Sequence, residues 1–531
     1  MAIVVNEFNT PNPDDPFGSP RLPEEWLKPP FKWEVPVWSK LRWGPANIRV
    51  LVVTDGAHYD ETAEFGVGIF LKDAFDVTHP EHPSYARFNF THATHQNRYP
   101  IDYNPDPGFD RILLTPDKLN GFDELWLFGV KTGAPYLQPA EIAAVEAFMD
   151  AGGGVLAMGD HEDLGLGLCG QIKRVRSMRK WWFQSPAPPA GMLVAPDDID
   201  LTRNDTVHAV IPGGNVNLGE QTDSTPQTIF PNYRYAWNWW RPRHRVKYPH
   251  PVLCGPRGAI QVMPDHQHEG DCILPDAAFA AEYPGGVPVE IIARGRNVVG
   301  RTKAGYTVTD PREFGLVGVW DGHDARAGKG RVIVDSTWHH WFNMNLVELR
   351  AENGNEYKDI LAYFRNVAIW LAPKSQQDAM RRAGSLVFML SPSMIEHTLT
   401  LRDFRVEAIY PLGVYARDVL GRISPQCQST AWFIWWVEKL MPKAMLKAAA
   451  ARGFNERIDV FEAAAMDVMV ASILGGIVNA LAISINERGF KNLEALHEEM
   501  DDIAERGGKL GFDAATKQLI GTQRQIKDLL S

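Results

Sequence analysis

Residues 47–62, with the sequence NIRVLVVTDGAHYDET, decide the fold class of this chain. The run is apolar up to Thr54 and then changes to turn residues, which is typical of a strand buried on both faces of a parallel sheet. Two later runs follow the same pattern, FDELWLFG over 122–129 and GGVLAMG over 153–159. The three runs predict the central strands of an α/β domain.

Helical patterns separate these predicted strands. Residues 65–75 and 138–152 each place apolar side chains on one face at helical spacing. The alternation resumes with apolar runs within 313–342 and ends with a predicted helix over 355–373. Alternating strands and helices favour a doubly wound, mostly parallel, flavodoxin-like sheet.

Other parts of the chain do not follow this alternation. Residues 1–45 are rich in Pro and Trp and predict an extended arm. Residues from about 166 to 316 lose the alternation and predict a long irregular, β-containing insertion within an α/β domain over 46–375. Residues 376–531 contain helical patterns and predict an α-helical C-terminal domain.

The composition excludes some classes of function. The chain has 531 residues, of which 45% are hydrophobic and 22% charged, as in a folded protein of more than one domain. A formal net charge of -11 argues against general nucleic-acid binding and favours a small-molecule substrate. Four cysteines without CxxC spacing, and a start without a long apolar segment, lead us to expect a cytoplasmic protein. No nucleotide cofactor is evident.

The uncharged segment Val468–Ile485 is long enough to raise the question of a membrane span. Gly475, Gly476 and Asn479 interrupt it, and Lys/Arg asymmetry is lacking at its ends, so we expect a buried helix and no membrane span. A helix that is apolar on all sides must be buried against something. The segment therefore predicts a homo-oligomer or a helical partner bound through the C-terminal domain.

Imidazole and carboxylate side chains follow the predicted strands where those strands end. The groups are Asp55 and His58, then Asp160, His161 and Glu162, and finally His339 and His340. The carboxyl ends of parallel strands meet at one edge of a sheet, where ligands bind, so we expect a shared pocket. The segment VMPDHQHEGD adds a fourth group, His266, His268 and Glu269.

This density of imidazole and carboxylate suits Zn, Mn or Fe, and the predicted metal ligands are His266, His268, Glu269 and His340. The predicted catalytic residues, which would activate water, are Asp160, His161, Glu162 and His339. Asp55 and His58 are predicted to support the substrate. The alternatives are structural: Asp55 braces a turn, Asp160 caps a following helix, and one of the adjacent histidines is a packed aromatic residue.

Aromatic side chains alternate within 232–251, NYRYAWNWWRPRHRVKYPHP. In an extended segment Tyr235, Trp237 and Trp239 share one face, on which a sugar ring could stack, so they are predicted substrate-binding residues. The alternative is a β-hairpin that covers the insertion. The basic stretch 172–182, IKRVRSMRKWW, predicts either an anion-binding surface or arginines in water.

Several of these stretches together resemble the class I glutamine amidotransferase-like superfamily, and within it the trehalose-utilisation (ThuA-like) group. The stretches are IRVLVVTDGAHYDET, FDELWLFG, EIAAVEAFMDAGGGVLAMGDHED and AGKGRVIVDSTWHHW. In the ThuA-like group a GGG strand runs into a His-containing turn where true amidotransferases have Cys, and a late GKGRV strand leads to a histidine. The resemblance covers about 46–165 and 314–372.

The resemblance implies that His161 occupies the position of the amidotransferase nucleophile, and that His339 or His340 occupies the late position. It implies the fold more than the activity, because the superfamily hosts several activities. We therefore expect a hydrolase-like enzyme that lacks the Cys nucleophile and uses a His/carboxylate pocket, with a divalent metal, to activate water on a small sugar- or amide-containing substrate. The alternative is a noncatalytic module that binds carbohydrate or protein.

Overall fold

The computed structural model of the protein describes most of the chain from residue 45 onward. The described residues are 45–79, 81–82, 85–182, 226–237, 245–264, 270–296, 313–389, 394, 406–423, 436, 439–440, 460–488 and 493–531. The chain divides into two compact units, 1–42 and 43–531, and all the described residues belong to the second. The predicted N-terminal arm thus lies, except for Pro45, outside the described residues.

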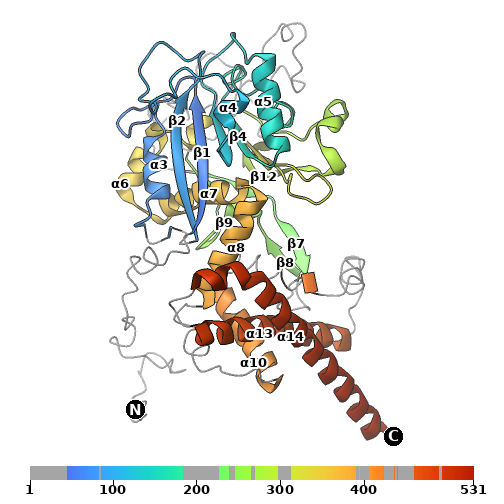
Figure 1. Ribbon diagram of the computed structural model, residues 1–531. Coiled ribbons are helices and arrows are strands. Elements are labelled where there is room, and N and C mark those ends of the chain that lie inside the picture. Colours follow the sequence, from blue (N-terminus) through green and yellow to red (C-terminus); the bar gives the residue numbers. More distant parts are fainter. Residues whose placement is uncertain are drawn as a thin grey trace, which may run out of the picture. The chain divides into compact units, whose positions relative to one another are not determined.

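The second unit contains a mixed sheet of eight strands (Figure 1). In spatial order its strands are β2 (Ala86–Thr94), β1 (Ala46–Thr54), β3 (Glu124–Phe128), β4 (Gly154–Met158), β14 (Val332–Asp335), β13 (Glu313–Trp320), β12 (Val289–Arg296) and β6 (Phe230–Pro231). The first five are parallel to one another, and β13, β12 and β6 are antiparallel to their neighbours. The α/β prediction with a mostly parallel sheet is confirmed.

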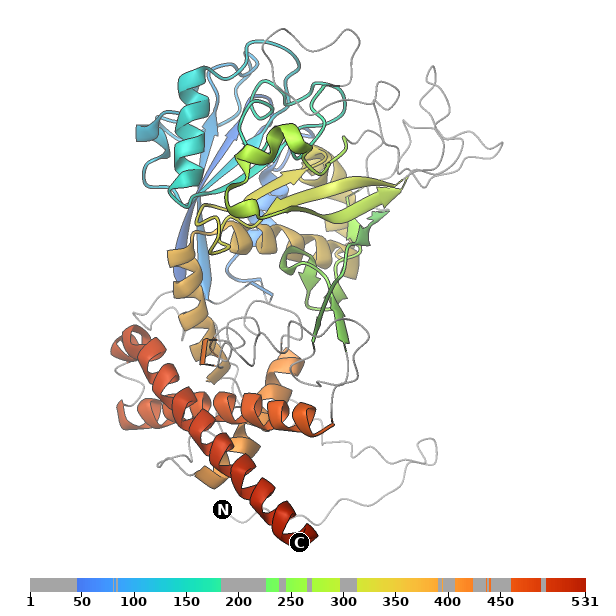
Figure 2. The same ribbon diagram turned by 90° about the vertical axis from the view of Figure 1, so that its right-hand side faces the viewer.

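Helices cover both faces of the parallel strands (Figures 1 and 2). Helices α3 (Gly68–Phe75) and α7 (Asn355–Leu371) pack on one face, and α4 (Pro116–Leu119) and α5 (Pro139–Asp150) pack on the other. Each strand sends alternate side chains to the two faces, and both sets are apolar. This explains why these strands appear in the sequence as continuous apolar runs.

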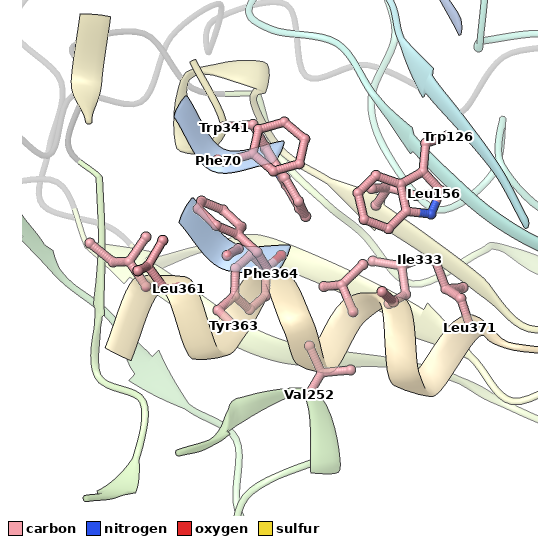
Figure 3. Packing of buried hydrophobic residues seen from close by; sticks show 14 of the residues in the cluster. Phe70, Trp126, Leu156, Val252, Ile333, Trp341, Leu361, Tyr363, Phe364 and Leu371 are labelled. Carbon is pink, nitrogen blue, oxygen red and sulfur yellow. The ribbon is translucent and has the colours of Figure 1, made fainter. Parts of the chain in front are cut away.

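The core between α7 and the sheet contains a group of aromatic side chains among aliphatic ones (Figure 3). Trp126 of β3 lies 5.7 Å from Trp341, between ring centroids, and Phe70 of α3 meets Trp341 edge-on at 5.1 Å. Phe364 of α7 packs on the other side of this group, 4.6 Å from Trp341. The packing fixes the segment around Trp341 against the sheet, directly after β14 ends.

Two features of the sheet differ from the sequence prediction. Strand β2, with the sequence ARFNFTHAT, is not among the predicted strands; it lies at the sheet edge, and most of its residues are partly buried or exposed. Strand β13 was expected to continue the alternating α/β pattern, and it runs antiparallel to β14. Strands β6 and β12 from the predicted insertion also join the main sheet.

The rest of the described insertion contains short antiparallel strand pairs. These are β5 (Gln227–Thr228) with β11 (Val262–Met263), β9 (Cys254–Gly255) with β10 (Gly258–Ala259), and β7 (Arg234–Trp237) with β8 (Arg245–Tyr248). Three 3-10 turns accompany them, η1 (Pro251–Leu253), η2 (Ala277–Glu282) and η3 (Pro284–Gly286). The described insertion is thus irregular and contains strands, as its sequence predicts.

Within the described residues after 373, four longer helices follow the sheet in sequence. They are α8 (Lys374–Met389), α10 (Val406–Ile423), α13 (Val460–Arg488) and α14 (Leu493–Leu530). Helix α8 runs across the predicted domain boundary at 375, and its Arg381 pairs with Asp501 of α14 at 2.7 Å. Glycines mark the contacts among the other three: Gly476 of α13 lies against Gly507 of α14, and Gly475 lies against Gly413 of α10.

The predicted apolar segment lies within α13. By length and composition alone, Val468–Arg488 could cross a membrane, and 78% of its most apolar window is buried inside the structure. A core helix of a soluble protein passes the same test. The expectation that this segment does not span a membrane stays a prediction.

Candidate functional site

The last residues of the five parallel strands form one row. Thr54 of β1 is paired with Thr94 of β2 and with Phe128 of β3, Phe128 is paired with Met158 of β4, and Met158 is paired with Asp335 of β14. The segments that follow these strands therefore leave the sheet at a common edge. Three of these segments carry the predicted polar residues.

The Asp160 carboxylate links two of these segments. Asp160 follows β4 and is fully buried. Its Oδ2 atom lies 2.7 Å from His161 Nδ1 and 3.7 Å from His339 Nε2, so one oxygen lies between two imidazoles. Its Oδ1 atom accepts a hydrogen bond of 2.8 Å from the Thr337 hydroxyl. The structure thus brings together three of the four predicted catalytic residues.

The two imidazoles differ in their surroundings. His339 is 3% exposed, its Nδ1 lies 2.9 Å from Asn345 Oδ1, and its ring lies against Trp338 with centroids 3.8 Å apart. The side chain of His161 is 14% exposed. His161 is therefore the imidazole of this pair that is more accessible from solvent.

The backbone reverses sharply after β4. Asp160 N donates to Leu164 O at 3.2 Å, and the fourth predicted catalytic residue, Glu162, has a φ of 56°, in the left-handed region that few L-residues adopt. Turns and bends follow through residue 178, so the alternative in which Asp160 caps a following α-helix is wrong. The sharp return of the chain to Leu164 accounts for the difference.

His339 and His340 lie in a 3-10 turn, η4 (Trp338–His340), and their side chains have different partners. His340 is fully buried, with Nδ1 2.6 Å from Asp335 Oδ1 and Nε2 2.9 Å from Gln227 Nε2. Both ring nitrogens thus contact protein groups. These contacts match the alternative in which one of the two histidines is structural.

Asp335 is the partner of His340 and is also fully buried. Its Oδ2 atom accepts hydrogen bonds of 2.9 Å from Trp341 Nε1 and from the Tyr363 hydroxyl. Burial raises the pKa of Tyr363, and the neighbouring Asp335 raises it further. Side chains from η4, the following residue and α7 thus converge on a single carboxylate, which fixes the turn that carries His339.

Asp55 and His58 follow β1. The buried Asp55 Oδ1 atom accepts hydrogen bonds from the backbone N–H groups of Val130, at 2.6 Å, and Lys131, at 3.2 Å. Burial raises the pKa of Asp55, and these two hydrogen bonds partly offset the rise. Asp55 therefore braces the loop after β3, whereas the partly exposed His58 lies against Tyr103 with ring centroids 4.7 Å apart.

Several predicted site residues lie outside the described part of the chain. They are His266, His268 and Glu269 of the predicted metal site, and Trp239 of the aromatic platform. The backbone of Tyr235 and Trp237 lies in β7, which pairs with β8 as a hairpin. Within the described residues no group of three or more His, Cys, Asp or Glu side chains is suited to a metal ion.

The residues that flank the 265–269 segment are described, and both are held near the end of β14. Pro264 O accepts a hydrogen bond of 3.2 Å from Gln227 Nε2, the same atom that faces His340. Gly270 N donates to Ser336 O, also at 3.2 Å. Gly270 thus contacts the strand end that carries His339 directly, and Pro264 is linked to it through Gln227.

Sequence reasoning missed three residues that build this site: Thr337, Asn345 and Arg179. Thr337 lies beside the predicted histidines, and a hydroxyl between a strand and a histidine turn was the available signal. Arg179 belongs to the basic stretch 172–182, which predicted an anion-binding surface or arginines in water, yet Arg179 is fully buried. No local pattern distinguishes it from Arg176, which pairs with Glu282 at 2.8 Å.

Comparison of the chain with protein-family models and with curated proteins finds no match.

Proposed function

We propose that the protein is a hydrolase-like enzyme that lacks a Cys nucleophile and uses His161 to activate water. One observation carries the proposal. The buried Asp160 carboxylate contacts imidazoles from two strand ends, 2.7 Å from His161 Nδ1 and 3.7 Å from His339 Nε2. A histidine oriented by a buried carboxylate is a recurring general base in hydrolytic sites.

The proposed mechanism depends on which ring nitrogen of neutral His161 carries the proton. With Nδ1–H donating to Asp160, neutral His161 carries its lone pair on Nε2. That nitrogen takes a proton from water as the water oxygen attacks the substrate, and the Asp160 carboxylate stabilises the imidazolium that forms. Both oxygens of Asp160 contact other side chains, so in this proposal Asp160 orients His161 and does not itself act as the base.

His339 is the second catalytic group of the proposal. Its Nδ1 atom is held by Asn345, and its Nε2 atom faces the same Asp160 oxygen as His161. Because Nδ1–H donates to Asn345 Oδ1, His339 carries a hydrogen on Nε2 only as the imidazolium, and in that form its charge stabilises the Asp160 carboxylate while His161 is neutral. Glu162, next to His161, is retained as a candidate group that contacts the substrate.

The fold supports the family resemblance in a limited way. The five parallel strands lie in the order β2-β1-β3-β4-β14, the order 2-1-3-4-5 of flavodoxin-like sheets. In such sheets ligands bind at the carboxyl ends of the strands, where Asp160 and His161 lie. We therefore retain the amidotransferase-like, ThuA-like proposal with a small sugar- or amide-containing substrate.

A divalent metal remains a separate proposal. The described residues do not fit a metal centre: His340 has protein partners at both ring nitrogens, and His161 Nδ1 and His339 Nε2 both face Asp160. The predicted ligands His266, His268 and Glu269 lie outside the described residues. No step above depends on a metal, and elemental analysis of the purified protein tests for one.

The function is tested with p-nitrophenyl ester, anilide and glycoside probes. We expect His161→Gln and Asp160→Asn to lower kcat/KM by about 100-fold or more on the probe class that the wild type hydrolyses, the usual contribution of general base catalysis. His79→Gln is the control, because His79 follows α3 and lies near the opposite edge of the sheet.

Equal rates for the wild type and His161→Gln would contradict the proposal. So would the absence of hydrolysis on every probe class by a folded wild-type protein. In the second case the noncatalytic module becomes the better proposal, and binding of neutral sugars would be the next measurement.

A further inference from the structure

Arg179 lies beneath the candidate site and connects its two halves. Its guanidinium is fully buried. It donates to Asp160 O, after β4, and to Ser336 O, after β14, the latter at 2.9 Å from Nη2 and 3.1 Å from Nε. A further bond of 3.0 Å goes from Nη1 to Lys180 O. One side chain from the insertion thus holds together the two strand ends that carry His161 and His339.

The hydrogen bonds of Arg179 do not neutralise its charge. All three acceptors are main-chain carbonyl oxygens, and Trp181 lies 4.5 Å from the guanidinium carbon, measured to the ring centroid. Burial lowers the pKa of Arg179, which reflects the cost of holding a cation away from water. Apolar residues of similar size commonly stabilise a core as well as a buried charge does. The charge therefore calls for an explanation other than packing.

The charge faces two carboxylates of the same strand ends. Asp160 and Asp335 are both fully buried, and both favour the charged form of Arg179. Two buried carboxylates at one sheet edge repel each other, and a cation between the strands that carry them offsets this repulsion. The hydrogen bonds of Arg179 and its positive charge thus both act on the same two strand ends.

We propose that Arg179 is the positioning residue of the candidate active site. Its guanidinium binds the turns that carry His161 and His339, and its positive charge offsets the negative charge of the buried Asp160, which orients His161. The inference rests on the proposed function. It also makes the insertion a part of the active site, because Arg179 lies outside the region of family resemblance.

Several charged groups surround His161 and enter the test. Asp160 contacts its Nδ1 atom, Glu162 is its neighbour in sequence, and Asp163 interacts with it electrostatically. His339 faces it across the Asp160 oxygen, and Arg179 lies on the other side of Asp160. Removal of the Arg179 charge leaves the negative groups in place, so the protonated imidazole becomes more favourable.

The experiment measures the pKa of His161 by NMR in the full-length protein labelled with ¹³C-histidine, and it needs no substrate. His161→Gln assigns the resonance. We expect Arg179→Met to raise the pKa of His161 by on the order of one unit and Arg179→Lys, which keeps the charge, to leave it near the wild-type value. Arg174→Met is the matched control, because the buried Arg174 pairs with Asp150 at 2.6 Å. Thermal unfolding confirms that each variant is folded.

Three results would overturn the proposal: no change in any variant, the same change in Arg179→Lys and Arg179→Met, or the same change in Arg174→Met. If Arg179→Met does not fold, Arg179→Lys alone decides: a His161 pKa that differs from the wild-type value, although Lys keeps the positive charge, would overturn the proposal. If Arg179→Met raises the pKa of His161 but the wild type hydrolyses none of the probes, the role proposed for Arg179 would stand and the hydrolase proposal would be rejected.

Discussion

Trp338 and Trp341 lie close together in the sequence but differ in the hydrogen bonding of their indole N–H groups. Trp341 Nε1 donates to the buried Asp335 carboxylate at 2.9 Å. Trp338 Nε1 is buried and has no acceptor among the described residues, although its ring lies against His339 and, at 4.5 Å between centroids, against Phe342. A buried donor without an acceptor costs about 1–3 kcal/mol of folding free energy.

These two tryptophans give a matched pair of variants. We expect Trp341→Phe to lower the free energy of unfolding by about 1–3 kcal/mol or more, because Asp335 loses a donor. Trp338→Phe removes the indole N–H donor and should leave the free energy of unfolding unchanged or raise it. The cost of burying that donor disappears, and this gain offsets the packing lost with the smaller ring. Urea unfolding of both variants checks this. Equal losses would mean that Trp338 has an acceptor after all.

How much of the candidate site can be predicted from the sequence depends on where each contact comes from. Asp160, His161 and His339 follow apolar strands, so the rule that ligands bind at the carboxyl ends of parallel strands brings them together. Asn345 lies six residues after His339, and Arg179 reaches the site only through folding of distant segments. In the sequence Arg179 is one of several arginines in a basic stretch, and its burial depends on the ends of β4 and β14, which no local pattern reveals.

At the level of whole elements, burial on both faces separates the strands that the sequence predicts from those that it does not. Strands β1, β3 and β4 are buried on both faces, so each appears as an apolar run that a single sequence reveals. Strand β2 lies at the sheet edge and most of its residues are partly buried or exposed, so it lacks a continuous apolar run. The direction of β13 depends on its pairing with β14, which composition does not encode.

The contact between α13 and α14 depends on glycine. A Cβ atom at Gly476 would collide with the backbone of Gly507 and would lie 3.0 Å from Gly511 Cα. We therefore expect Gly476→Ala to lower the free energy of unfolding by about 1–3 kcal/mol, as overpacking does. Gly521→Ala on α14 is the control, because its Cβ would have nothing within 4 Å.

The control should change stability in the opposite direction. Alanine is favoured over glycine in a helix by up to about 1 kcal/mol, so Gly521→Ala should raise the helix content or the unfolding temperature slightly. Circular dichroism during thermal unfolding measures both variants. A neutral Gly476→Ala would mean that α13 and α14 can separate without loss of stability, which would argue against a close contact.

For the molecule as a whole, acid stability depends on a buried pair that joins β2 to α5. His95 Nε2 lies 2.8 Å from Glu141 Oε1, and both side chains are almost fully buried. Burial alone would raise the pKa of Glu141, but hydrogen bonds from His95 and from the backbone of Leu114 and Gln138 outweigh it. The pKa of Glu141 is therefore lowered from 4.5.

The sign of the pH effect follows from this lowered pKa. The contribution of Glu141 to stability is fully present above its unfolded pKa of about 4.5 and is lost as the pH falls through its lower folded value. Glu141→Gln should therefore be less stable than the wild type at pH 7, and this difference should shrink below pH 4.5. Urea unfolding from pH 3 to pH 7 measures it, with the exposed Glu348→Gln as control.

A constant difference in the free energy of unfolding between the wild type and Glu141→Gln at every pH would contradict this account, because it would mean that the charge of Glu141 is irrelevant.

The other whole-molecule proposals, a cytoplasmic location and self-association through the C-terminal helices, concern properties that the fold alone does not specify. Solution mass measurement of the purified chain tests the second.

The pairing of β4 with β14 has a consequence for synthesis of the chain. The contact between Asp160 and Thr337 joins residues that are 177 positions apart. At a translation rate of about 5–20 residues per second, β4 waits on the order of 10–35 s as an open, apolar edge after it leaves the ribosome. Nascent chains are therefore most prone to aggregation in this interval, and chaperones have their longest opportunity to bind there.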